Sequence, residues 1–212
     1  MFMIIAKDLL YPAPFYNFLS YLSESDVKGQ ILDCGSGGPS PKQALFVLLG
    51  FDAFGIEFSE ERLEMAQDYA KQHNLELFMQ LGDMRTMPFE SNYFGHVYSW
   101  NTIFHMNKKD IKKAIGEMIR VLKPEGLCFV NFLSVDSEFY GEGEEENPGE
   151  FIQIEGDEKI MHTFFTDEES DGFFDNLEIE ILYKEKRILH KKLKDRVMKD
   201  SYINYIVQKK RS

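Results

Sequence analysis

Cysteine is scarce in this sequence: its 212 residues include two, Cys34 and Cys128. Both lie within apolar runs, far apart along the chain, and no Cys-x-x-Cys pair occurs. The sequence therefore offers neither a zinc site nor a dithiol redox motif, and we predict no metal centre. We expect both cysteines to be buried free thiols in a reducing compartment.

Basic residues are also in deficit, since 24 Lys and Arg face 36 Asp and Glu and the formal net charge is -12. Binding to a phosphate backbone depends on Lys and Arg that release counterions, so this balance argues against nucleic acid as a partner. No apolar run approaches the roughly 20 residues of a membrane span. Lys7 and Asp8 interrupt the apolar N-terminal run, which argues against a signal peptide. We therefore expect no membrane partner and a cytoplasmic location.

Strand-like and helix-like segments alternate from residue 30 onward, in a chain that is 43% hydrophobic and 14% aromatic. Apolar runs that end in turn residues predict five strands, at residues 31–34, 53–56, 75–81, 96–100 and 127–133. Such alternation is typical of βαβ units around a mainly parallel sheet. The sequence thus predicts a doubly wound α/β fold in one main domain, residues 30–212.

Side chains suited to helix N-caps lie between these strands. Ser40, with Gln43 three residues later, predicts a capping box that opens a helix ending at Gly50. Ser59 and Asn107 each predict the start of a further helix.

The chain changes character after residue 135. Residues 136–150 hold seven acidic and no basic side chains, and we interpret them as an exposed loop. Thr166 predicts another helix start. Residues 178–189 and 202–207 predict two strands that pair as a hairpin-like end to the sheet, with a basic stretch between them.

The N-terminal segment, residues 1–29, precedes the first predicted strand and carries Phe15, Phe18 and Leu22 at helical spacing. We predict that it forms a helical lid or cover over a ligand site, with Tyr11 as a candidate contact. A helix that only packs on the sheet explains the same spacing.

A glycine turn follows the first strand, where Asp33, Gly35 and Gly37 belong to the segment Asp-Cys-Gly-Ser-Gly. Glycine lets the backbone turn sharply and approach a ligand closely. The helix that follows presents unpaired N–H groups, which favour an anionic group such as a carboxylate. By itself this pattern serves many nucleotide ligands.

Acidic residues stand at the ends of the next two strands. Glu57 lies about 20 residues beyond the glycine turn, where a carboxylate can accept hydrogen bonds from ribose hydroxyls. Asp83, followed by Met84, can accept a hydrogen bond from an adenine amino group. Ligands of open α/β sheets lie outside these carboxyl ends of the strands. The alternatives are that Glu57 is only an exposed side chain and that Asp83 only forms a turn.

Asn101 and His105 follow the fourth strand, where a cofactor and a second substrate would meet. The unperturbed pKa of histidine is about 6.5, so His105 is a candidate proton acceptor near neutral pH. Its apolar neighbours also fit a histidine that only packs in the core.

Taken in order, these segments resemble class I (Rossmann-like) S-adenosylmethionine-dependent methyltransferases of the small-molecule type. The matching segments are residues 31–37, 54–59, 82–84, 88–89 and 119–127. The resemblance implies a seven-stranded sheet with an antiparallel last strand, and S-adenosylmethionine as the cofactor. It also implies methyl transfer to a small-molecule acceptor, which it does not identify.

The resemblance implies a role in cofactor binding or catalysis for each residue that matches a functional position of the family. The implied cofactor-binding residues are Asp33, Gly35, Gly37, Glu57, Asp83, Met84 and Asn101. Among them, the glycine turn contacts the methionine part, Glu57 holds the ribose, and Asp83 with the Met84 backbone holds adenine. His105 is the candidate catalytic base. One departure is Pro39, which stands where the family usually has a third glycine.

Two alternatives remain open on the sequence alone. A nicotinamide-dependent dehydrogenase also uses a glycine turn and an acidic ribose anchor, but its fingerprint requires Gly or Ala at the position of Ser40. A catalytically inactive binding or regulatory protein could keep the same fold and cofactor pocket.

Deleting residues 1–14 tests the predicted lid. We expect the rate of methyl transfer to fall more than the stability of the protein, because the lid would act on the site and not on the core. Full activity of the truncated protein, measured beside its thermal unfolding, would show that the segment is no lid.

Overall fold

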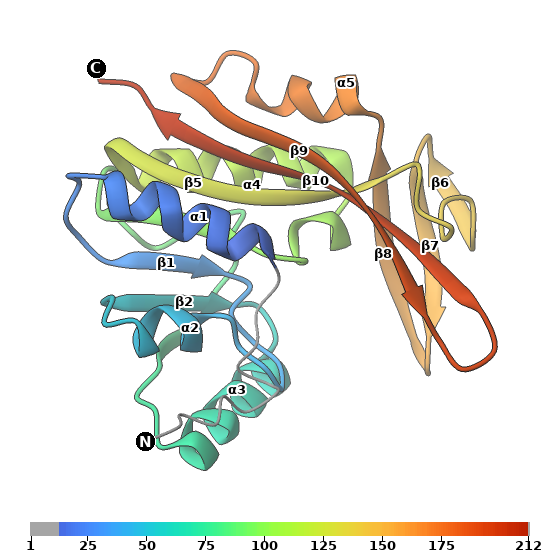
Figure 1. Cartoon of the computed structure of the whole chain (residues 1–212), viewed down its shortest axis with the longest axis horizontal. Coiled ribbons are helices and arrows are strands. Elements are labelled where there is room, and N and C mark those ends of the chain that lie inside the picture. Colours follow the sequence, from blue (N-terminus) through green and yellow to red (C-terminus); the bar gives the residue numbers. More distant parts are fainter. Residues whose placement is uncertain (1–12, 212) are drawn as a thin grey trace.

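The computed structural model describes residues 13–211, and Figure 1 shows how the elements are arranged. The helices are α1 (Ala13–Glu24), α2 (Gln43–Leu48), α3 (Glu60–His73), α4 (Lys108–Val121) and α5 (Asp167–Asp171). The strands are β1 (Ile31–Cys34), β2 (Ala53–Glu57), β3 (Phe78–Leu81), β4 (Phe94–Ser99), β5 (Leu122–Ser134), β6 (Glu144–Asn147), β7 (Glu150–Glu155), β8 (Glu158–Phe165), β9 (Ile179–Lys192) and β10 (Val197–Lys209).

Seven strands form the main sheet, in the order β3-β2-β1-β4-β5-β10-β9. The first five are mutually parallel. β10 runs antiparallel to both β5 and β9, and its ladder with β5 extends from Tyr202 opposite Leu133 to Gln208 opposite Leu127. The predicted seven-stranded, mainly parallel sheet with an antiparallel last strand is confirmed, as is the predicted C-terminal strand pair.

Helices cover both faces of this sheet. On one face, Phe15 and Phe18 of α1 pack with Phe46 of α2 against Tyr98 and Phe129 of the sheet. α4 covers the other face and contributes six buried side chains: Ile111, Ala114, Ile115, Met118, Ile119 and Val121. The sheet is therefore doubly wound. β1 and β4 at its centre are fully buried, as their apolar sequences indicate, whereas the edge strand β3 is partly exposed.

The predicted N-terminal helix exists as α1, and its apolar stripe is buried against the sheet. This packing accounts for the spacing of Phe15, Phe18 and Leu22 without a lid. The assignment of residues 1–29 as a cover stays a prediction, and Tyr11 lies outside the described residues.

The helix predicted to start at Ser40 is shorter, because α2 begins at Gln43. Lys42 occupies the N-cap position with helical dihedral angles and makes no side-chain cap. Gln43 does not close a capping box either. Its buried side-chain amide donates hydrogen bonds to the carbonyl oxygens of Ala53 (2.8 Å) and Phe78 (3.0 Å). The buried amide therefore connects α2 to two strands of the sheet.

The other predicted helix starts are confirmed. The side chains of Ser59, Asn107 and Thr166 each accept a hydrogen bond from the backbone N–H three residues later, at 3.3, 2.9 and 3.1 Å. Cys34 and Cys128 are buried free thiols, as expected. Among residues 13–211, no helix is long and apolar enough to cross a membrane.

The interpretation of residues 136–150 as a loop is wrong in part. Glu144–Asn147 forms β6, which pairs antiparallel with β7, and β7 pairs with β8. This three-stranded unit, the β6–β8 sheet, joins the main sheet through two residue pairs of β5 with β8, Leu133 with Phe164 and Ser134 with Phe165. The side chains of β6 are exposed, and its glutamates give this strand the composition of a loop.

Glu150 shows how this acidic segment is held in place. Its side chain is buried, and Oε1 accepts a hydrogen bond from the backbone N–H of Lys108 at 2.6 Å. Its Oε2 accepts a second hydrogen bond from Asn147 at 2.8 Å. One of the seven acidic residues therefore anchors the β6–β8 sheet to the start of α4.

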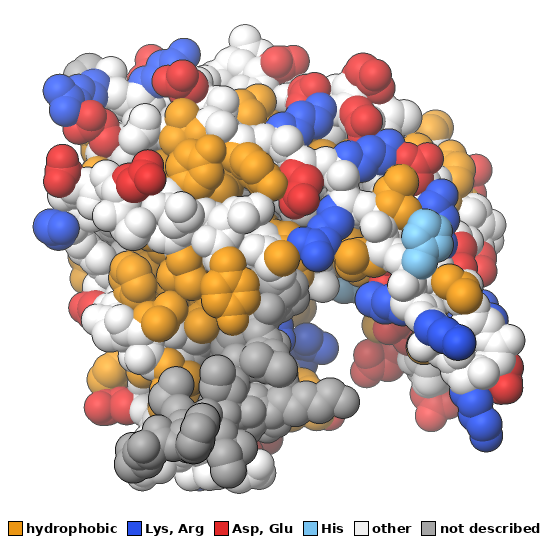
Figure 2. All heavy atoms as spheres, in the orientation of Figure 1, with side chains coloured by type: hydrophobic (Ala, Val, Ile, Leu, Met, Phe, Trp, Pro, Cys, Tyr) orange, Lys and Arg blue, Asp and Glu red, His pale blue; other side chains and the backbone are white. Residues whose placement is uncertain are grey.

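The hairpin of β9 and β10 extends past the main sheet toward the β6–β8 sheet (Figure 1). Residues 184–199 include eight Lys and Arg but only two acidic residues. Figure 2 shows basic side chains on the lobe at lower right, where the end of this hairpin lies. Lys186 pairs with Asp136, and Arg196 with Glu138, so the hairpin and the acidic segment attract each other.

His96 predicts a pH dependence of folding. Its buried ring accepts from the Leu127 N–H at 3.2 Å and lies 3.3 Å from the Val27 carbonyl oxygen, and burial lowers its pKa to about 4. The unfolded chain, with a histidine pKa of about 6.5, binds more protons between these values. The contribution of His96 to the free energy of unfolding is therefore fully present above pH 6.5. It is lost as the pH drops toward 4, by up to about 3 kcal/mol.

Urea unfolding of the wild type and of His96→Gln, measured from pH 4 to 8, checks this expectation. The amide of Gln can replace the two hydrogen bonds but does not titrate, so the variant should lose less stability on acidification. Equal pH dependence in both proteins would remove His96 as the cause.

Candidate functional site

The glycine turn follows β1 and packs tightly against two other segments. Gly35 has a φ of +90°, and a Cβ atom there would lie 2.3 Å from the Thr102 Cγ2 atom. Gly37 donates its N–H to Glu57 Oε2 at 2.8 Å, and its Cβ would lie 2.5 Å from the same oxygen. Neither position therefore has room for a side chain. The turn packs closely against Glu57 at the end of β2.

Glu57 is the last residue of β2 and is 6% exposed. Besides the Gly37 N–H, its carboxylate accepts the N–H of Ser59 at 2.9 Å through Oε1. Two backbone donors fix the carboxylate, and charge-assisted hydrogen bonds of this kind are strong. The carboxylate also lines a cavity, so its orientation toward a ligand is set in advance.

This cavity, which we call the first cavity, has a volume of about 270 Å³ and lies at the carboxyl ends of the parallel strands. Its lining residues are Gly35, Ile56, Glu57, Phe58, Gly82, Asp83, Met84, Arg85, Thr102, His105 and Met106. Four predicted cofactor-binding residues and the candidate base are thus brought together. Gly37 does not line the cavity but is hydrogen-bonded to Glu57, which does.

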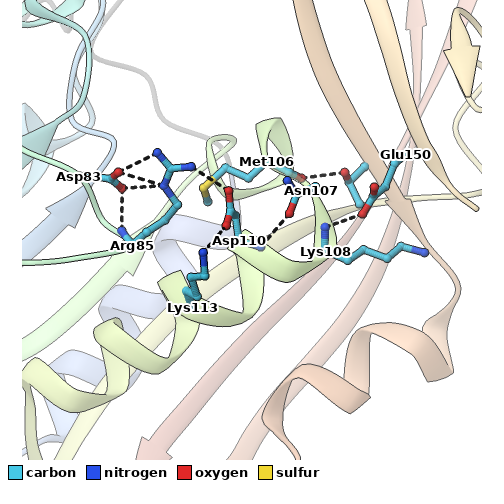
Figure 3. Close-up of polar contacts among 9 residues, drawn as sticks. Asp83, Arg85, Met106, Asn107, Lys108, Asp110, Lys113 and Glu150 are labelled. Atoms are coloured by element: carbon cyan, nitrogen blue, oxygen red, sulfur yellow. Dashed lines mark hydrogen bonds and ion pairs between the residues drawn. The ribbon is translucent and has the colours of Figure 1, made fainter. Parts of the chain in front are cut away.

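Asp83 has a partner that sequence reasoning missed. Arg85 donates to both carboxylate oxygens of Asp83, through Nε at 3.0 and 2.9 Å and through Nη2 at 2.7 Å. Its Nη1 reaches Asp110 Oδ2 on α4 at 2.8 Å (Figure 3). Arg85 also holds the pKa of Asp83 below its usual value. Asp83 is therefore ionised, and both of its carboxylate oxygens are bound by an arginine two residues later.

Asp33 lies beneath the turn and does not line the first cavity. It is 2% exposed, and the Tyr98 hydroxyl donates to its Oδ2 at 2.6 Å. Burial raises the pKa of Asp33 to about 7. The carboxyl group thus titrates near neutral pH and would be ionised by a nearby positive charge.

Asn101 lies apart from the other predicted cofactor-binding residues. It has a φ of 50° and exchanges two hydrogen bonds with Asn131, as N–H donor at 2.8 Å and as side-chain acceptor at 2.6 Å. It does not line the first cavity. Instead, it lines two neighbouring cavities, of about 510 and 290 Å³.

His105 ends a short 3₁₀ helix (Ile103–His105) and lines both the first cavity and the cavity of about 510 Å³, which we call the second cavity. Its Nδ1 lies 3.2 Å from the Met161 carbonyl oxygen. A carbonyl accepts only, so Nδ1 carries the proton and Nε2 keeps its lone pair. Desolvation, followed by the nearby His162, lowers the pKa of His105 to about 4. The ring is therefore neutral at pH 7.

The second cavity lies where the β6–β8 sheet meets the end of the main sheet. Its lining residues are Asn101, Phe104, His105, Leu133, Phe139, Glu142, Gly143, Gln153, Ile154, Glu155, His162, Phe164, Asp200 and Tyr202. Sequence reasoning found only Asn101 and His105 among them. The others belong largely to segments whose strands the sequence did not reveal.

Comparison with known proteins gives the class. Residues 31–126 match a family model described as "Methyltransferase domain". A S-adenosylmethionine-dependent methyltransferase of Methanosarcina mazei has a similar structure, with a TM-score of 0.75 and 19% identity over 96% of this chain and 99% of that one. A Burkholderia thailandensis N-methyltransferase with bound S-adenosylhomocysteine gives a TM-score of 0.67 at 10% identity, over 97% and 79%. The fold is that of the Rossmann-like methyltransferases.

Sequence relatives agree with this class. Sterol 24-C-methyltransferase of Saccharomyces cerevisiae is 30% identical over 155 residues, which are 71% of this chain and 39% of that protein. A putative methyltransferase of Bacillus subtilis is 32% identical over 59% of this chain and 51% of its own length. The chain thus spans about half the length of such relatives or less. Together, the family match over residues 31–126 and these relatives and neighbours support the class I S-adenosylmethionine-dependent methyltransferase superfamily, with S-adenosylmethionine as the cofactor.

Glu57→Ala tests the first cavity. Removing the carboxylate should raise the dissociation constant of S-adenosylmethionine by about 10- to 100-fold, because each hydrogen bond to a charged group contributes roughly 1.5–3 kcal/mol. Isothermal calorimetry measures the constant, and circular dichroism checks the fold. Glu61→Ala, an exposed acidic residue in the first turn of α3, is the matched control and should bind like the wild type. Unchanged affinity in folded Glu57→Ala would exclude Glu57 from the site.

Proposed function

We propose that this protein transfers the methyl group of S-adenosylmethionine to a small molecule that enters the second cavity. The observation that supports the proposal is the position of His105, which lines the first and the second cavity at once. A volume of about 510 Å³ is in the range of sites that take drug-sized molecules. The boundary between the cavities is where donor and acceptor would meet.

The residues of the first cavity fit the cofactor. Glu57 accepts hydrogen bonds from the ribose, and its fixed carboxylate has further lone pairs beyond the two that Gly37 and Ser59 use. Asp83 and the Met84 backbone hold adenine, with Arg85 sharing the Asp83 carboxylate. The close approach at Gly35 leaves no room for a side chain beside Thr102.

The methionine part of the cofactor lies toward the glycine turn in this proposal. Gly35 brings the backbone close to it, and Asp33, buried beneath the turn, acts on its ammonium group through charge and not by direct contact. A positive charge beside Asp33 lowers a pKa that burial has raised. Asn101 contacts the same end of the cofactor from the side of the second cavity.

The cofactor supplies a methyl group that is already activated by a positively charged sulfur. The protein therefore contributes mainly by holding donor and acceptor in line. When bound, the cofactor would give this methyl group to a lone pair of the acceptor, with the sulfur as the leaving group. His105 Nε2 accepts a hydrogen bond from an acceptor O–H or N–H and takes its proton as the new bond forms, since Nδ1 is held by Met161.

The small-molecule acceptor class is supported by relatives as well as by the cavity. Besides the yeast sterol 24-C-methyltransferase, a demethylmenaquinone methyltransferase of Desulfitobacterium hafniense is 33% identical over 97 residues. The absence of a nucleic-acid partner stays a prediction from the acidic composition. A cytoplasmic location stays a prediction from the sequence of residues 1–10 and the lack of a long apolar run. A screen of candidate acceptors for release of S-adenosylhomocysteine tests the proposal. Cofactor binding without transfer to any acceptor would favour the inactive alternative.

His105→Gln tests the role of the histidine once an acceptor is found. We expect kcat to fall by about 10²-fold or more with the cofactor dissociation constant kept, because the variant loses the base and not the binding carboxylates. Since the pKa of His105 is lowered to about 4, the wild-type rate should show no histidine ionisation near pH 6.5 and should fall only below about pH 5.

His190→Gln on β9 is the matched control and should leave kcat unchanged. An unchanged kcat in His105→Gln, at saturating cofactor, would return His105 to a packing role.

A further inference from the structure

The second cavity is negatively charged. Glu142, Glu155 and Asp200 line it, and no Lys or Arg of the described chain does so. Asp200 Oδ2 pairs with Lys191, but Lys191 lines the separate cavity of about 290 Å³. Glu142 and Glu155 have no such cationic partner among residues 13–211 apart from the His162 contact of Glu155.

The two histidines of the cavity do not offset this charge. Desolvation lowers the pKa of both His105 and His162, so both rings are neutral at pH 7. The negative charge of the cavity also acts on Tyr202. Its pKa is raised to about 12, first by burial and then by the charge of Asp200. A bound cation would lower the energy of this arrangement, whereas a bound anion would raise it.

His162 adds a buried polar atom without a partner. Its side chain lines the cavity, the residue is 8% exposed, and Nε2 lies 3.3 Å from Glu155 Oε1. The Ile160 backbone acts on the pKa of the ring, yet Nδ1 has no partner with the geometry of a hydrogen bond. Buried polar groups are normally satisfied, so His162 has hydrogen-bonding capacity that the protein leaves unused at the wall of this cavity.

Aromatic rings form much of the remaining wall. Phe104, Phe139, Phe164 and Tyr202 line the cavity together with Leu133. Such rings bury an apolar body, and their faces attract a cation within about 6 Å of the centroid. Carboxylates and aromatic faces together are the chemistry that selects an organic cation over an anion of the same shape.

The order of the side chains separates two ends of the cavity. His105 stands at the boundary with the first cavity, its ring 4.7 Å from that of His162 between centroids, and His162 in turn contacts Glu155. The rings of His105 and His162 thus lie between the Glu155 carboxylate and the boundary where methyl transfer would occur. A protonated amine has no lone pair, so a group held as a cation by Glu155 is not the methylated atom.

We propose that the acceptor is a small, mainly apolar or aromatic molecule with a positively charged amino group that binds near Glu142 and Glu155. A second, uncharged nucleophile on the same molecule receives the methyl group beside His105. This inference rests on the proposed function, because it takes the second cavity as the acceptor site.

Three phenols of similar shape test the charge preference: tyramine, which is cationic, 4-ethylphenol, which is neutral, and 3-(4-hydroxyphenyl)propionate, which is anionic. Calorimetry first measures binding of S-adenosylhomocysteine to the full chain. Binding of each phenol is then measured by saturation-transfer NMR in its presence, so that no turnover is needed. We expect tyramine to bind at least tenfold more tightly than the propionate and more tightly than 4-ethylphenol.

Glu142→Gln and Glu155→Gln should each reduce the preference for tyramine by about three- to tenfold. Glu144→Gln removes the same charge from β6 without touching the cavity lining, and should change the preference less than twofold. Both lining residues are exposed enough that folding should persist, and circular dichroism checks this.

The outcomes separate the two proposals. Failure to bind S-adenosylhomocysteine would contradict the proposed function itself. If S-adenosylhomocysteine binds, three results would overturn the charge preference alone: equal or tighter binding of the propionate, binding of none of the phenols, or an equal effect of Glu144→Gln.

Discussion

The Glu57 carboxylate is the contact on which the rest of the site depends. One of its oxygens accepts the Gly37 N–H from the turn after β1, and the other accepts the Ser59 N–H at the start of α3. A single buried side chain thus connects two βα units at the edge where their strands end. Without these two hydrogen bonds, the glycine turn would lose one of its contacts with β2, and the Glu57 carboxylate would lose its fixed orientation toward the first cavity.

A second level of organisation is built outward from that edge. β5 continues past the end of β4, and its last residues pair with β8, which brings the β6–β8 sheet beside the short 3₁₀ helix that carries His105. Glu150 then binds the first backbone N–H of α4, while Asp110 of the same helix binds Arg85 (Figure 3). The start of α4 therefore holds together the walls of both cavities.

Local sequence signals predicted the main sheet well, because each depends on few neighbouring residues. Short apolar runs gave the parallel strands, and Ser59, Asn107 and Thr166 gave helix starts that their own side chains stabilise. Gln43 misled the prediction, since its amide serves distant backbone carbonyls and not the adjacent turn. Strand β6 was missed for a different reason: all its side chains are exposed, so hydrophobic alternation is absent there.

The same contrast holds for the site. Gly35, Glu57, Asp83 and Met84 meet at one cavity because parallel strands end at one edge, and strand order alone brings them together. The engagement of Asp83 by Arg85 and the lowered pKa of His105 depend on side-chain packing that spacing does not encode.

The β6–β8 sheet joins the main sheet through only two residue pairs and lies wholly beyond residue 126, where the family match ends. Under the proposed function, the residues that line the donor cavity all lie within this match, whereas most of those that line the acceptor cavity lie beyond it. The donor part lies within the residues that match the family model. The β6–β8 sheet can change in sequence without disturbing Glu57 or the glycine turn. Sequence similarity over residues 31–126 is therefore a poor guide to the molecule that binds in the second cavity.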